Sequence, residues 1–278
     1  MHRQSSQRSG SVADKIYCMK PLFAMLALMC CVQTVSAQDL SAFEKKEFIK
    51  GKDTLRYRIV YPEKYRKHKA YPLLLVLHGS GERGRDNEAQ LVHGGKRFLD
   101  ANIRKHFKAI VIFPQCPKDS SWSRYRRSAT NLVLEPGDNP TVPQQLVKEL
   151  IDEMVAAKKL DERRLYVGGL SMGGMGTYDM LTRYPDYFAA AFPICGIANI
   201  PLFIDRSSQI PLWIFHGGKD NVVSPDPDRE LFKAMMTRGI KTVNYTEYPS
   251  MGHNSWDSAF IEPKLLPWLF SNKKKRAN

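Results

Sequence analysis

Several familiar signatures are absent from this chain of 278 residues. It has no P-loop and no dinucleotide-binding fingerprint, so we expect no nucleotide-type cofactor. His78 and Glu82 are four residues apart, but they lie in a glycine-rich stretch without a second histidine on the same face, so we expect no metal. The apolar stretch 21–32 is too short to cross a bilayer, so we expect no stable membrane insertion.

Acidic residues are also in short supply. The chain has 28 Asp and Glu against 42 Lys and Arg, a formal net charge of +14. The basic residues are scattered and form no nucleic-acid reading module, so charge alone does not predict a nucleic-acid partner. The run Lys273 to Arg276 is interpreted as a solvated, frayed end.

The first 37 residues are typical of a secretory signal peptide. Lys15 and Lys20 flank the start of the apolar stretch 21–32, and the small residues of 35–37 precede Gln38. We therefore predict an exported protein, periplasmic or extracellular, whose mature chain starts at Gln38. Residues 38–278 are the right size for one domain with its own core.

Two alternatives remain open at this end of the chain. Met19 followed by Lys20 would be a more usual signal start than Met1. Cys30 would suit a lipid-anchored protein, but the preceding Leu28 and Met29 lack the small residue that such processing favours.

Apolar runs alternate with helical patterns through the rest of the chain. A hairpin is predicted from 47–50 and 54–61, and residues 143–158 carry one apolar helical face. The remaining strands are predicted at 73–77, 109–113, 165–167, 190–194, 212–215 and 243–248. Alternation of this kind indicates an α/β fold with a mostly parallel central sheet flanked by helices on both faces. Nothing in the sequence indicates an oligomeric state.

Cys116 and Cys195 are the two cysteines that remain after Cys18, Cys30 and Cys31 of the signal. In the expected strand order, two strands separate those that end near Cys116 and Cys195. Three strand spacings amount to about 14 Å, beyond the roughly 7 Å Cα limit of a disulfide. We therefore expect two free thiols.

The sequence Gly169-Leu170-Ser171-Met172-Gly173 follows the apolar strand 165–167 and precedes the helical stretch 175–183. A G-x-S-x-G pattern at a strand-to-helix turn is typical of a nucleophile elbow, in which glycines leave room for a strained, exposed serine. Ser171 is therefore the candidate nucleophile.

An acid and then a histidine should follow the serine along the chain. His253 is our candidate base, whereas His216 is interpreted as a structural residue at a strand end. Asp220 is the preferred acid because it comes directly off an apolar strand. Asp226 and Asp228 remain competitors, although they alternate with prolines and resemble a turn followed by a helix N-cap.

An acyl transfer through Ser171 would also need backbone donors for the oxyanion. The N–H of Met172, directly after the nucleophile, is one candidate. The strand 73–77 runs into His78-Gly79-Ser80-Gly81-Glu82, and Ser80 is the candidate for the second donor.

These motifs together resemble the α/β-hydrolase superfamily. They comprise the stretches 77–84, 114–117, 169–174, 216–220 and 252–257. More narrowly, the chain is similar to secreted bacterial carboxylesterases of the phospholipase/carboxylesterase and feruloyl-esterase-like group, some of them labelled predicted peptidases. The resemblance covers about residues 57–270 and implies the Ser171–His253–Asp220 triad and the oxyanion donors. It implies a serine esterase that forms an acyl-enzyme.

The stretch 196–210 leaves room for only a turn or one small helix, so we expect no large cap domain over the site. Trp122 and Trp256 are candidates to line a pocket for the acyl or alcohol part of a small-molecule or polysaccharide-borne ester. Residues 124–127 are more simply a solvated basic loop than a contact for an anionic substrate.

Short acyl or hydroxycinnamoyl esters of plant polysaccharides are the expected substrates. A serine peptidase of the prolyl-oligopeptidase type and a non-catalytic binding protein are the alternatives.

Overall fold

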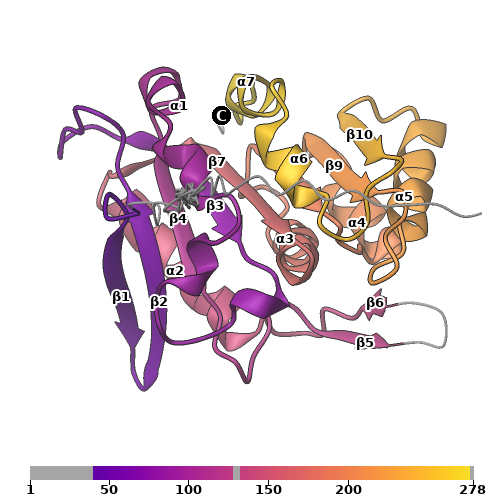
Figure 1. Cartoon of the computed structure of the whole chain (residues 1–278), viewed down its shortest axis with the longest axis horizontal. Helices are drawn as coiled ribbons and strands as arrows, with labels where there is room; N and C mark the ends of the chain where they lie inside the picture. The colour runs from indigo at the N-terminus through magenta and orange to yellow at the C-terminus, as the bar shows by residue number, and fades with distance from the viewer. Residues whose placement is uncertain (1–39, 128–131, 276–278) are drawn as a thin grey trace, which may run out of the picture. The chain divides into compact units, whose positions relative to one another are not determined.

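A mostly parallel sheet forms the centre of the molecule. The computed structural model describes residues 40–127 and 132–275, so the predicted signal peptide lies outside the described residues. The strand order is β1-β2-β4-β3-β7-β8-β9-β10 (Figure 1). β1 pairs with β2 and β2 with β4 antiparallel, whereas the other neighbours pair in parallel. The eight strands are β1 (Glu44–Lys50), β2 (Asp53–Val60), β3 (Tyr71–Leu77), β4 (Ile110–Gln115), β7 (Leu160–Leu170), β8 (Ala190–Ile194), β9 (Leu212–Gly217) and β10 (Val243–Tyr248).

Alternate residues of each central strand face opposite sides of the sheet, because the side-chain period of a strand is two. In β3, Leu73, Leu75 and Leu77 belong to one apolar cluster, whereas Leu74 and Val76 belong to the other. Both faces of the sheet are therefore covered, which explains why these strands are near-continuous apolar runs.

The helices divide between the two clusters. α2 (Val142–Ala156), α3 (Met172–Arg183), α4 (Ile200–Ser207) and α5 (Asp226–Thr237) contribute buried side chains to the first cluster. α1 (Ala101–His106), α6 (Trp256–Ile261) and α7 (Leu265–Ser271) contribute to the second. This is the predicted α/β architecture with helices on both faces. Among the described residues, no helix is long and apolar enough to cross a membrane.

Two helix starts differ from the sequence expectation. α3 begins at Met172 instead of position 175, so Gly173 and Gly174 belong to its first turn, where a Cβ would clash with the Leu77 or Ile194 carbonyl. α5 begins at Asp226 after the N-cap Pro225, so the expected N-cap role for Asp226 or Asp228 is wrong. Asp228 lies inside the first turn with its side chain fully buried.

Residues 124–126 after β4 are exposed, as the predicted solvated basic loop requires, but part of this stretch forms a strand. Tyr125–Arg127 form β5, which pairs with β6 (Leu132–Leu134) in a separate two-stranded sheet. Arg124 donates hydrogen bonds to the backbone carbonyls of Pro136, Asn139 and Pro140, and therefore ties this hairpin to the segment before α2.

The segment between β8 and β9 contains one short helix, α4, as predicted, and no cap domain lies among the described residues. Parallel strands bring their carboxyl ends to one edge of the sheet, so the loops after β3, β7, β9 and β10 meet there. Cys116 follows β4 and Cys195 follows β8, with β3 and β7 between them. Both thiols are free, as expected, and both are buried.

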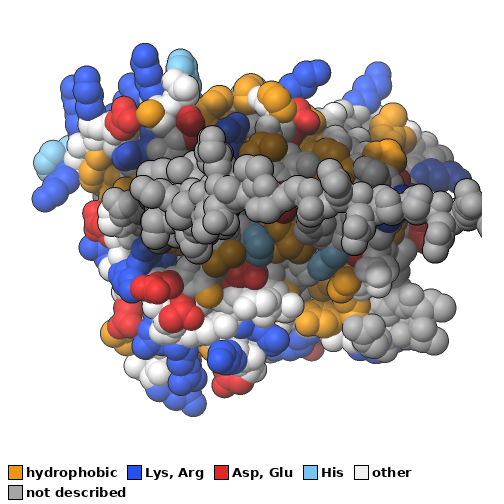
Figure 2. All heavy atoms as spheres, viewed as in Figure 1, with side chains coloured by type: hydrophobic (Ala, Val, Ile, Leu, Met, Phe, Trp, Pro, Cys, Tyr) orange, Lys and Arg blue, Asp and Glu red, His pale blue; other side chains and the backbone are white. Residues whose placement is uncertain are grey.

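Lys and Arg side chains are spread along the upper and lower edges of the face seen in Figure 2, with Asp and Glu among them. The scattered charge of the sequence therefore remains scattered on this face of the fold.

Candidate active site

Ser171 occupies a sharp turn between β7 and α3. Its backbone lies at φ 54° and ψ −116°, a conformation that costs free energy in a non-glycine residue. A Cβ on Gly169 would lie 2.6 Å from the Leu77 carbonyl oxygen, and one on Gly173 only 2.0 Å from it. The turn therefore needs glycine on both sides of the serine, as the nucleophile elbow predicts.

His253 and Asp220 meet Ser171 from the loops after β10 and β9. His253 Nδ1 lies 2.7 Å from Asp220 Oδ2, and its Nε2 lies 2.9 Å from Ser171 Oγ. Because a carboxylate only accepts hydrogen bonds, Nδ1 carries the proton and Nε2 can accept the hydroxyl proton of Ser171. The structure thus brings together the three residues that the sequence selected as a candidate triad.

Backbone contacts hold these two loops against each other. The Lys219 N–H donates to the Met251 carbonyl at 2.8 Å, and a Cβ on Gly217 would lie 2.1 Å from the Gly252 carbonyl oxygen. Asp220 Oδ1 accepts the N–H groups of Val222 and Val223, both at 2.9 Å. The carboxylate is therefore fixed from two sides while Oδ2 faces the histidine.

Asp220 is held ionised. Burial alone would raise its pKa, but hydrogen bonds from His216 and His253 and from the two backbone N–H groups outweigh burial and hold the pKa well below its usual range. His216 ends β9, as its interpretation as a strand-end residue predicted, and its side chain is fully buried. Its contact with Asp220 was not predicted.

The two candidate oxyanion donors come from the start of α3 and from the loop after β3. Met172 is the first residue of α3, where the N–H groups of the first turn have no acceptor within the helix. Ser80 follows Gly79 at the end of β3 and starts the 3₁₀ helix η1 (Ser80–Glu82). Arg83 Nε donates to the Ser80 carbonyl, and its Nη1 donates to the Lys118 carbonyl, both at 3.0 Å, so the loop is fastened to the segment after β4.

His78 sets the direction of the peptide before Ser80. Its Nε2 accepts the Cys116 N–H at 2.9 Å, so its Nδ1 carries the proton that is donated to the Gly79 carbonyl at 2.6 Å. In a trans peptide the C=O and N–H point in opposite directions, so the Ser80 N–H points away from His78. Burial lowers the pKa of His78 to about 4, which keeps this ring neutral. The sequence placed His78 in the motif but not in this role.

Trp122 does not line the site, contrary to the expectation from sequence. Its indole is 0% exposed, donates from Nε1 to the His78 carbonyl at 3.0 Å, and packs against the ring of His78. A Cβ on Gly176 of α3 would lie 2.5 Å from Trp122 Cβ, so the ring fills the space that this glycine leaves. From inside the core, Trp122 supports the loop 78–82, here called the oxyanion loop because it carries the candidate donor Ser80. Trp122 therefore offers no surface to a substrate.

Trp256 does lie at the site. Its ring stands edge-on to His253, with ring centroids 5.2 Å apart, and also contacts His93 at 5.1 Å. His93 in turn lies 3.5 Å from Glu82 Oε1 in the oxyanion loop. The hydrogen bond to Glu82 raises the pKa of His93. Sequence reasoning missed His93 because it precedes the serine and belongs to no motif.

Cys195 lies close to the site but is a poor metal ligand. Its Sγ, a nitrogen of His216 and a carboxylate oxygen of Asp220 lie within 4.8 Å of one another. Burial raises the pKa of the Cys195 thiol to about 12, and Sγ already contacts Ser255 Oγ at 2.8 Å. A metal would need the thiolate, so these residues do not fit one.

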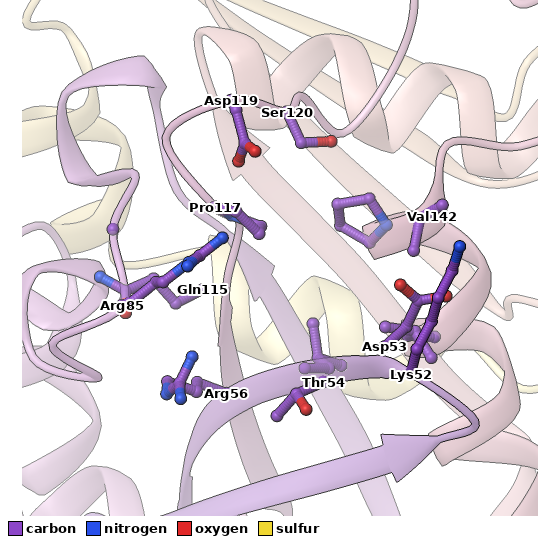
Figure 3. A pocket seen from close by; sticks show the side chains of 14 residues that line it. Lys52, Asp53, Thr54, Arg56, Arg85, Gln115, Pro117, Asp119, Ser120 and Val142 are labelled. Atoms are coloured by element: carbon purple, nitrogen blue, oxygen red, sulfur yellow. The ribbon is translucent and has the colours of Figure 1, made fainter.

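A polar cavity of about 490 Å³ lies at the edge of the sheet where the parallel strands have their carboxyl ends, the edge that also carries Ser171 (Figure 3). It opens between the start of β2, the loop after β4 and the start of α2, and its lining includes Lys52, Arg56, Arg85, Asp119 and Ser120. Two strand spacings, about 10 Å, separate the end of β4 from the end of β7 at Ser171. Gln115 in its wall donates from Nε2 to the Glu82 carbonyl, so the cavity shares a wall with the oxyanion loop.

Comparison with known proteins defines the class. The family described as "Putative esterase" matches residues 52–231. A thermostable esterase of known structure superposes with a TM-score of 0.75 at 32% identity, covering 84% of this chain and 64% of that one. A ferulic acid esterase from Anaeromyces mucronatus, solved with ferulic acid, gives a TM-score of 0.57 at 16% identity, covering 81% of this chain and 89% of that one, and shows the fold alone.

Curated relatives cover less of the chain. Poly(3-hydroxyalkanoate) depolymerase C of Paucimonas lemoignei is 32% identical over 127 residues, 45% of this chain and 28% of its own length. Probable acetylxylan esterase A of Neosartorya fischeri is 27% identical over 149 residues, 53% of this chain and 38% of its own length. The chain thus spans less than half the length of these relatives.

The fold is that of the α/β-hydrolases. The chain belongs to the esterase family matched over residues 52–231, and its resemblance to the feruloyl-esterase-like carboxylesterases is confirmed.

Proposed function

We propose that the protein is a serine carboxylic-ester hydrolase that works through Ser171, His253 and Asp220. The observation that carries this proposal is the continuous hydrogen-bonded chain from Ser171 Oγ through His253 to Asp220, at 2.9 and 2.7 Å, on a strained elbow. A serine hydroxyl becomes an effective nucleophile only when a neighbouring base removes its proton, and this chain supplies that base.

The proposed reaction has two halves. In the first, His253 Nε2 takes the Ser171 proton while Oγ bonds to the ester carbonyl carbon, and the oxyanion accepts the N–H groups of Met172 and Ser80. The C–O bond to the alcohol then breaks, and His253 returns the proton to the departing oxygen, which leaves an acyl group on Ser171. In the second half a water gives one proton to His253 and attacks the acyl carbon. The bond from that carbon to Ser171 Oγ then breaks, and His253 returns the proton to Oγ as the acid leaves.

The triad roles predict a graded loss of turnover. Ser171→Ala and His253→Ala should each lower kcat by about four to six orders of magnitude, and Asp220→Asn by about four, because the three groups act as a unit. Ester hydrolysis and thermal unfolding should be measured together, since each variant is expected to remain folded. Activity that survives Ser171→Ala would rule out this nucleophile.

For substrates we propose short acyl or hydroxycinnamoyl esters, including those on plant polysaccharides. Relatives named as acetylxylan esterases, and ferulic acid esterases with the same fold, support this choice. α4 is the one short helix between β8 and β9, which leaves the approach to Ser171 open to a bulky alcohol part. The polar cavity beside the oxyanion loop offers carboxylates, hydroxyls and cations of the kind that bind sugar hydroxyl groups.

Trp256 is the proposed stacking surface for an aromatic acyl group. Trp256→Ala should lower kcat/KM for both classes of ester, since the ring also contacts His253. If the ring stacks on the acyl group, the loss should be about 2- to 13-fold greater for a feruloyl than for an acetyl ester. Equal losses on the two esters would reject the stacking role.

Trp122→Phe is the matched control for this comparison. Because Trp122 is fully buried, the change should lower the free energy of unfolding by about 1–3 kcal/mol and leave the ratio of feruloyl to acetyl activity unchanged.

In the same assay, faster cleavage of a peptide amide than of any ester would favour the serine peptidase. A folded protein that cleaves neither would favour the non-catalytic binding protein.

Export is a further part of the proposal. We expect cleavage after Ala37, which gives a mature domain of residues 38–278 that starts at Gln38 and lies in the periplasm or outside the cell. N-terminal sequencing of the exported protein should find Gln38. A start at Cys30 or Cys31 carrying lipid would instead establish the lipoprotein alternative.

A further inference from the structure

A second histidine, His216, also contacts the triad carboxylate. His216 Nε2 lies 3.3 Å from Asp220 Oδ2, the same oxygen that His253 contacts, and 3.0 Å from the Val223 carbonyl oxygen. The other ring nitrogen, Nδ1, lies 2.7 Å from Asp228 Oδ2. The side chains of His216, Asp220 and Asp228 are all fully buried.

The partners of this ring determine its charge. Both nitrogens of His216 face oxygens that only accept hydrogen bonds: two carboxylates and a backbone carbonyl. A neutral imidazole has one N–H, so in either tautomer a lone pair would point at an oxygen 3.0 Å away or less. An imidazolium donates from both nitrogens and satisfies every contact.

We propose that His216 is a permanently protonated positioning residue, which shares the Asp220 carboxylate with His253 and holds it ionised and in place. The inference rests on the proposed function for its catalytic consequence, but the protonation itself does not. Burial alone would lower the pKa of His216, whereas its hydrogen bonds to Asp220 and Asp228 raise the pKa to about 10, in agreement with the geometry.

Groups on the neighbouring elements complete this cluster. From α3, the Tyr178 hydroxyl donates to Asp228 Oδ1 at 2.7 Å. On β10, Glu247 accepts hydrogen bonds from Arg229 of α5 at 2.8 Å and from the Tyr245 hydroxyl at 2.6 Å. Cys195, at the end of β8, lies within 4.8 Å of His216. Burial raises the pKa of the Cys195 thiol and of Tyr178, so both stay neutral. Beside Asp220, the fully buried charged side chains of this cluster are therefore His216 and Asp228.

The charges of His216 and Asp228 act on the ring of His253. Both histidines contact Asp220 Oδ2, so their two ring nitrogens lie within about 6 Å of each other, where like charges repel measurably. The His216 cation disfavours positive charge on the His253 ring, and the Asp228 carboxylate partly offsets that effect.

Protonation can be measured without activity. ¹⁵N NMR of the histidine rings in the wild-type protein should show both nitrogens of His216 carrying protons throughout pH 6 to 9. A bare ring nitrogen on His216 anywhere in that range would overturn the proposal, whether or not the protein proves to be an esterase.

Two variants should shift the acid limb of the kcat/KM profile in opposite directions along the pH axis. His216→Gln removes the cation and should move the acid limb of the kcat/KM profile up by about one pH unit, whereas Asp228→Asn removes the anion and should move it down. A purely structural role for the pair would lower kcat in both variants without moving the limb. His106→Gln, a change at an exposed histidine on α1, is the matched control and should leave the profile unchanged.

A double variant that keeps the net charge separates loss of folding from loss of the His216 charge. Asp228 left without His216 is a buried unpaired charge, so His216→Gln is expected to be the less stable of the two. His216→Gln combined with Asp228→Asn removes one charge of each sign and should restore stability with a shift of the acid limb smaller than that of His216→Gln alone. An unmoved acid limb in folded His216→Gln would refute the proposal. Absence of esterase activity in the wild type would refute the proposed function instead.

Discussion

The packing of the first turn of α3 against the end of β3 is the constraint on which the site depends. No side chain fits between Gly173 and the Leu77 carbonyl, so the chain can turn there only with glycine. The turn forces Ser171 to a positive φ, and it leaves the first N–H groups of α3 beside the serine oxygen. The same turn therefore positions the proposed nucleophile and a proposed donor for the charge that the reaction would create, with local backbone strain as the cost.

The buried histidines His78 and His216 differ in charge because their partners differ. His78 Nε2 meets an N–H donor, so the ring is neutral and orients the peptide that leads to Ser80. His216 meets only acceptors, and a ring between two carboxylates holds two protons. Burial acts on both rings in the same direction, so the identity of the facing atoms decides the outcome.

Much of the fold and the placement of the triad candidates could be predicted from sequence. Near-continuous apolar runs are typical of parallel strands covered on both faces, and the chain order of Ser171, Asp220 and His253 is restricted once the elbow is recognised. The loop after β4 could not be predicted in the same way. Trp122 is apolar and follows a strand, a pattern shared by a pocket residue and a core residue, and only the space left by Gly176 decides between them.

Asp228 shows the same limit. A sequence of alternating prolines and aspartates is typical of a helix start, and α5 does begin there. Asp228, the third residue of that helix, nevertheless makes a buried contact with His216, which lies 12 residues earlier in the chain. His93 reaches Trp256 from a segment with no catalytic pattern at all. Contacts of this kind depend on the tertiary arrangement of loops, which local periodicity does not encode.

A crystal structure of the protein after reaction with a phosphonate ester would test the central claim most directly. The account predicts phosphorus bonded to Ser171 Oγ, one phosphoryl oxygen within about 2.7–3.1 Å of the backbone nitrogens of both Met172 and Ser80, and His253 still hydrogen-bonded to Asp220. A phosphonate on another side chain, or a phosphoryl oxygen that points away from these two nitrogens, would contradict it.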